Sequence, residues 1–68
     1  MFDWKVTMFT YYTDADENEC AEYDEFKIGK GGDFATMQDF EKYRDDVMRL
    51  FVNGGNTNVR TRCTFESV

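Results

Sequence analysis

The chain has 68 residues, a net charge of −6 and a hydrophobic fraction of 41%. This length allows one domain, residues 1–68, and the twelve aromatic residues can supply a small core. With 32% charged residues, the composition predicts a soluble globular chain rather than a disordered one. No run of about 18 apolar residues is present, so a transmembrane helix is excluded. The first residues lack the order of a signal peptide, and a cytoplasmic location is expected.

The negative charge is concentrated in the first third of the chain. Residues 1–25 carry a charge of −7, whereas residues 26–68 carry +1. Direct binding to nucleic acid is not expected, because phosphate contacts need clustered lysine and arginine. Binding to a basic protein surface is compatible with this distribution.

The first two elements are predicted to be strands. Residues 2–12 alternate apolar and polar side chains, beginning with Phe2 and Trp4 on one face. The polar run TDADENECA follows as the loop of a hairpin, and a second strand covers about residues 22–28, with Phe26 and Ile28 on one face. The sequence GKGG then predicts a turn.

An amphipathic helix is predicted over TMQDFEKYRDDVMRLFVN. Thr36 with Asp39 resembles a capping box at its start, and the glycines after Asn53 supply a left-handed residue at its end. Seven residues at helical spacing are expected to form the face that packs on the sheet. They are Met37, Phe40, Tyr43, Arg44, Val47, Leu50 and Phe51.

A last strand is predicted over residues 57–66, which completes the order β-β-α-β. The fold class is therefore α+β, a three-stranded antiparallel sheet in the order second–first–third strand, with one helix packed on one face. This order places the most apolar strand in the centre and the charged strands at the edges. The face under the helix is expected to hold Trp4, Val6, Met8, Phe26, Ile28, Val59, Cys63 and Phe65.

The stretch DADENECAEYDE, residues 14–25, holds half of the acidic residues. Asp14, Asp16, Asn18 and Glu25 fall at ligand positions of an EF-hand calcium loop. Glu19 stands where that loop needs glycine, and the flanking segments are predicted strands rather than helices. No metal site is therefore expected, with calcium binding kept as an alternative.

Catalysis is not expected either. The chain has no histidine and a single serine, Ser67, so neither a Ser-His nor a Cys-His pair can form. The stretch around Lys30 lacks the spacing of a phosphate-binding P-loop, and no cofactor is expected. Cys20 and Cys63 are expected to be reduced thiols, with a disulfide between them as the alternative.

Two surfaces are candidates for binding a partner. The first is the acidic stretch, whose carboxylates repel one another more than a simple hairpin requires. The second is the sheet face away from the helix, with part-exposed aromatic rings beside Arg60 and Arg62. The expected partner-binding residues are Asp14, Asp16, Glu17, Glu19, Glu22, Asp24, Glu25, Phe9, Tyr11 and Tyr23.

The acidic run and the β-β-α-β outline ending in NVRTRCTFE resemble the small acidic inhibitors that bacteriophages encode against host defences, of the anti-CRISPR and anti-restriction types. The resemblance involves no shared motif and carries over no site residue. It implies a non-enzymatic inhibitor in the host cytoplasm that binds a basic surface of a CRISPR effector or nuclease by steric block or DNA mimicry. A self-associating structural module, including a homodimer, and an antitoxin-like inhibitor of a host RNase are the alternatives.

Overall fold

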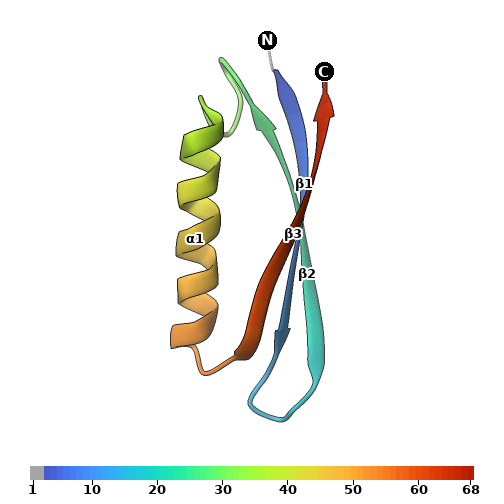
Figure 1. Cartoon of the computed structure of the whole chain (residues 1–68), viewed down its shortest axis with the longest axis vertical. Helices are drawn as coiled ribbons and strands as arrows, with labels where there is room; N and C mark the ends of the chain where they lie inside the picture. The colour runs from blue at the N-terminus through green and yellow to red at the C-terminus, as the bar shows by residue number, and fades with distance from the viewer. Residues whose placement is uncertain (1–2) are drawn as a thin grey trace.

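The computed structural model describes residues 3–68, which form one sheet and one helix (Figure 1). The elements are β1 (Trp4–Thr13), β2 (Glu19–Ile28), α1 (Met37–Asn53) and β3 (Thr57–Ser67). The sheet is antiparallel in the order β2-β1-β3, as the sequence predicted. Phe2, the predicted start of the first strand, lies outside the described residues. The molecule is elongated, measuring 42 × 18 × 13 Å.

β1 is the central strand and pairs with both neighbours over most of its length. Its register with β2 runs from Trp4 opposite Ile28 to Thr13 opposite Glu19. Its register with β3 is regular up to Tyr11, where it shifts. Asn58, at the start of β3, has a φ of 56° near this shift. The alternation along β1 buries Val6, Met8 and Thr10 on the helix side.

The ends of α1 follow the predicted signals. The Asp39 backbone N–H donates to the Thr36 hydroxyl over 3.2 Å, so the threonine caps the first turn. At the other end, the Gly54 N–H donates to the Leu50 carbonyl. Gly55 follows with a φ of 92°, in the left-handed region that glycine adopts without strain.

The core lies between α1 and the end of the sheet where β1 begins. Val6, Met8, Ile28 and Phe40 are its buried residues. Phe34, in the segment between β2 and α1, packs against this core, and Ile28 forms an isolated bridge with it. Ring contacts join Phe26, Phe34, Phe40 and Tyr43. The segment after the GKGG turn therefore closes the side of the core that the helix leaves open.

The predicted helix face is wrong at Leu50, which is 70% exposed. Met48 contacts the sheet instead, accepting a weak hydrogen bond from the Thr61 hydroxyl. Figure 1 shows the reason: the β1–β2 hairpin twists away from the C-terminal half of α1, so one flank of the helix loses its cover. Thr10, by contrast, was not expected in the core and is fully buried.

Both cysteines are free and half-buried. Cys20 lies in β2 opposite Tyr12, and Cys63 lies in β3 opposite Met8. Because β1 separates the two outer strands, the alternative of a Cys20–Cys63 disulfide is not realised. Among the described residues, the helix is neither long nor apolar enough to cross a membrane.

Candidate functional site

The acidic stretch is a short loop followed by a strand. The predicted hairpin loop, TDADENECA, is too long, because strand pairing continues to Thr13 and Glu19 and leaves only residues 14–18 between the strands. Three predicted site residues, Asp14, Asp16 and Glu17, lie in this loop. The other four carboxylates, at positions 19, 22, 24 and 25, lie along β2. Figure 1 shows that the hairpin carrying this loop extends beyond the end of α1.

The loop is held by its first residue. One carboxylate oxygen of Asp14 accepts hydrogen bonds of 2.9 Å from the backbone N–H groups of both Asp16 and Asn18. These bonds, chiefly the one from Asn18, lower the pKa of Asp14. Glu17 takes a φ of 66°, the left-handed conformation that lets the chain reverse here. The loop therefore keeps a fixed shape although it contains no apolar core.

The calcium-loop alternative does not fit this geometry. Asp14 is occupied by backbone donors of its own loop, and Glu25 lies at the far end of β2, where it pairs with Lys5 at 2.7 Å. Within residues 3–68, no group of three or more His, Cys, Asp or Glu side chains is arranged to hold a metal ion.

The alternation of β2 divides its carboxylates between two faces. Glu22 is opposite the buried Thr10, so Glu22 and Asp24 are on the helix side, whereas Glu19 and Glu25 are on the open side. All four are exposed. In the part of the chain that the structure describes, no ion pair involves residues 14–24. This part of the hairpin therefore presents negative charge without a neighbouring lysine or arginine to neutralise it.

Tyr12, which was not among the predicted site residues, contacts one of these carboxylates. Its hydroxyl donates to Glu22 over 3.0 Å, and its ring packs on Phe51 of the helix at 4.7 Å between centroids. The hydrogen bond to Glu22 raises the pKa of Tyr12 to about 12. The alternation of β1, continued past Met8, would have placed Tyr12 on the helix side beside β2.

The predicted aromatic residues come together on the open face of the sheet. The Phe9 ring lies 6.1 Å from Tyr11 and 5.2 Å from Tyr23, measured between centroids. The Arg60 guanidinium lies 5.4 Å from the Tyr11 ring centroid, a cation–π distance. Phe9 and Tyr11 are half-buried, as expected, and Tyr23 is 55% exposed. The three rings form one cluster across β1 and β2.

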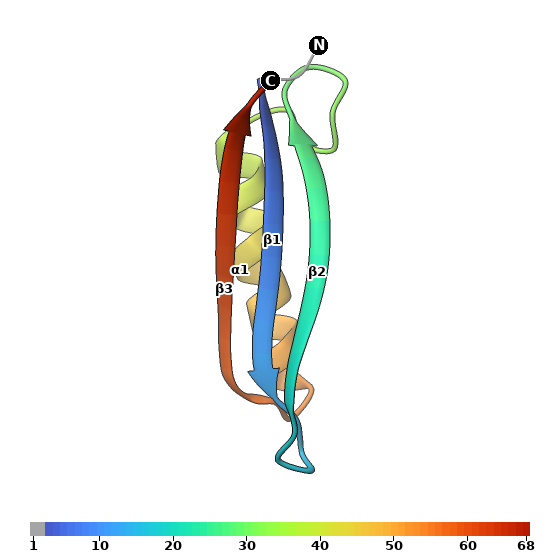
Figure 2. The same ribbon diagram turned by 90° about the vertical axis from the view of Figure 1, so that its right-hand side faces the viewer.

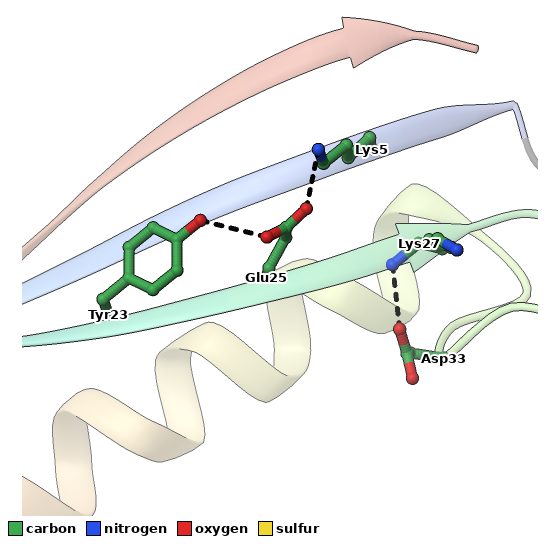
Figure 3. A network of polar contacts seen from close by, with 5 residues as sticks. All are labelled: Lys5, Tyr23, Glu25, Lys27 and Asp33. Atoms are coloured by element: carbon green, nitrogen blue, oxygen red, sulfur yellow. Dashed lines mark hydrogen bonds and ion pairs between the residues drawn. The ribbon is translucent and has the colours of Figure 1, made fainter.

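A polar network adjoins this cluster (Figure 3). Glu25 accepts a hydrogen bond of 3.0 Å from the Tyr23 hydroxyl and forms its ion pair with Lys5. Lys5, and then Tyr23, lower the pKa of Glu25. Glu25 is thus separated from the other acidic residues, because its charge is neutralised across the sheet.

The described part of the chain contains no detectable pocket, so both candidate surfaces are exposed faces rather than clefts. No family model, no curated protein and no solved structure matches the chain.

Proposed function

We propose that this protein is a non-enzymatic inhibitor that binds the basic, nucleic-acid-binding surface of a host nucleic-acid-processing protein, with a CRISPR effector as its target. The observation that carries the proposal is the projecting hairpin, whose carboxylates from Asp14 to Asp24 form no ion pair within residues 3–68. Carboxylates on the loop and on both faces of β2 can occupy lysine and arginine side chains that would otherwise contact phosphates.

The shape of the hairpin supports this function. The loop backbone is held by Asp14, and in the extended strand after it Glu22 and Asp24 lie two residues apart on the helix-side face, at about 3.3 Å per residue. A backbone ordered in this way loses little conformational entropy on binding. Tyr23, exposed beside Phe9, supplies an aromatic anchor next to the charged residues.

The test is capture on immobilised protein, followed by release with competing double-stranded DNA. We expect nucleic-acid-binding proteins of the host to be retained and then released by DNA. While the inhibitor is bound, these proteins should not shift labelled nucleic acid in a gel. The binding variant reverses three acids of the hairpin: Asp16→Lys, Glu19→Lys and Asp24→Lys. It should lose capture and inhibition, while circular dichroism shows that the fold is kept.

The matched control makes the same change of charge on the helix, with Glu41→Lys, Asp45→Lys and Asp46→Lys. These residues are exposed and belong to α1, not to the hairpin. If the two triple variants lose inhibition equally, net charge rather than the hairpin is responsible. Retained proteins that resist elution by DNA would contradict the proposal.

A further inference from the structure

The two edges of the sheet differ in how they are protected. At the β2 edge, the Lys27 N–H donates to the Asp33 carboxylate over 2.9 Å, and the Lys27 carbonyl accepts from the backbone of Asp33 and Phe34 (Figure 3). A second copy pairing with β2 would also bring its acidic residues against those of the first copy. The β2 edge is therefore closed at one end and repulsive along the rest.

The β3 edge has neither a covering segment nor a run of acidic residues. Figure 2 shows β3 as the outer strand, with only β1 beside it in the sheet. Val68 donates its N–H to the Asp3 carbonyl across the ladder. Because hydrogen-bonded pairs alternate along an antiparallel ladder, the even-numbered residues of β3 bond to β1. The odd-numbered residues Thr61, Cys63 and Phe65 then direct their backbone N–H and carbonyl groups outward.

From this edge we propose that the protein forms a homodimer by antiparallel pairing of β3 with β3 of a second copy, about a two-fold axis at Cys63. Thr61 of each copy then lies opposite Phe65 of the other, and their outward backbone groups form the new ladder. The result is a continuous six-stranded sheet with both helices on the same face. This inference does not depend on the proposed inhibitor function.

Charge complementarity and the length of the paired segment together select this register. With the axis at Cys63, Arg60 of each copy lies opposite Glu66 of the other, giving two ion pairs. Placing the axis at Thr61 sets Arg60 opposite Arg62, and placing it at Arg62 sets that residue opposite its own copy, so both registers juxtapose like charges. With the axis at Thr64, Arg62 would lie opposite Glu66, but β3 would pair only over residues 61–67 instead of 59–67. Arg60 stacks on Tyr11 and donates from Nη1 to the Asn58 carbonyl, which leaves most of its five N–H donors for Glu66.

Two apolar side chains on this side of the molecule would be covered by the second copy. Phe65 packs edge-on against Phe40 on its inner side and is 41% exposed. Met48 contacts Thr61 of β3, and Val52, one helical turn later on the same flank, is 56% exposed. A second helix on the same face of the extended sheet would lie next to this flank.

A charge swap tests the register, read by sedimentation equilibrium at several concentrations. Arg60→Glu and Glu66→Arg, each alone, should weaken the dimer about tenfold, because two attractive pairs become repulsive. The two substitutions combined in one chain should restore the native affinity of the dimer. The ion pairs between positions 60 and 66 then re-form with their signs exchanged, and the net charge is unchanged. The matched control combines Glu66→Arg with Arg62→Glu. Its dimer should remain weak, because Arg60 still lies opposite an arginine at position 66 of the second copy.

Cysteine oxidation provides a second measurement. In a Cys20→Ser variant, mild oxidation should link two chains through Cys63, because opposed hydrogen-bonded residues have Cα atoms about 5.5 Å apart, within disulfide range. A Cys63→Ser variant, which keeps Cys20, should stay unlinked. The proposal would be overturned by any of three results. These are a monomer at all concentrations, restoration of the dimer by the Arg62 swap instead of the Arg60 swap, and equal linking through Cys20.

Discussion

The two ends of the β1–β2 hairpin are held together by different forces. At the end under α1, Val6 and Ile28 are buried with Phe40 and close the core. At the other end, the loop is held by the carboxylate of Asp14, with no buried apolar residue between positions 11 and 25. One chain thus combines an end held by burial with an end held by local hydrogen bonds.

The difference explains how the acidic residues are tolerated. Like charges gathered at one end reduce the stability of the fold. Because the acidic residues of the loop, Asp14, Asp16 and Glu17, lie at the end away from the core, their repulsion acts away from the packing around Phe40. The surface of the loop end is therefore available for binding, whereas the surface of the core end is constrained by packing.

Truncating the central core ring should have the largest effect. Phe40→Ala removes a fully buried side chain and should cost about 3–5 kcal/mol. A domain of this size has a free energy of unfolding of roughly 3–10 kcal/mol, so much of the population should unfold. Urea denaturation followed by circular dichroism measures the change.

Leu50→Ala is the control for this prediction, since the sequence placed both residues on the same helix face. Leu50 is 70% exposed, and its truncation should change the free energy of unfolding by less than about 0.5 kcal/mol. An equal loss for the two variants would mean that α1 is rotated on the sheet.

A smaller, stabilising effect is expected at Thr10, where the core meets the polar half of the hairpin. Its hydroxyl is buried and has no hydrogen-bond partner among the described residues. Thr10→Val keeps the shape and removes the unpaired group, so it should raise the free energy of unfolding by about 1 kcal/mol. Thermal denaturation of Thr7→Val, on the open face of the same strand, provides the control and should show little change.

The loop end should respond locally rather than globally. Asp14→Ala removes the acceptor for two backbone N–H groups, so amide exchange should accelerate at Asp16 and Asn18 and stay slow at Val6 and Met8. The pKa of Asp14 is lowered in the folded state. Its contribution is therefore present above the pKa of the unfolded chain and is lost as the pH falls through the folded value. Acceleration throughout the sheet would contradict the separation of the two ends.

The smallest effect is a spectroscopic one at Tyr12. Its pKa is raised to about 12, so its ionisation should appear well above the ordinary tyrosine range when tyrosinate absorbance is followed with rising pH. The stability that it adds is complete below the ordinary tyrosine pKa and is lost as the pH rises towards 12. Glu22→Gln should lower this pKa, whereas Glu19→Gln should leave it unchanged.

The strand, helix and turn patterns of this chain are local, and the sequence was therefore sufficient to predict them. The alternation in β1, the Thr36 cap and the glycines after α1 each act within a few residues, and the structure bears out all three. The candidate site was predicted less well. The polar run TDADENECA was assigned to the hairpin loop, yet pairing with β1 extends β2 back to Glu19.

By itself, then, the sequence determined the α+β class, the strand order, the boundaries of α1 and the grouping of Phe9 with Tyr11 on the open face. Only the tertiary structure decided that Glu25 pairs with Lys5, that Tyr12 supports Glu22, and that Leu50 is exposed. The physical reason is the same in each case. Register and sheet twist bring together residues distant in the chain, and neither is encoded in the pattern of a single element.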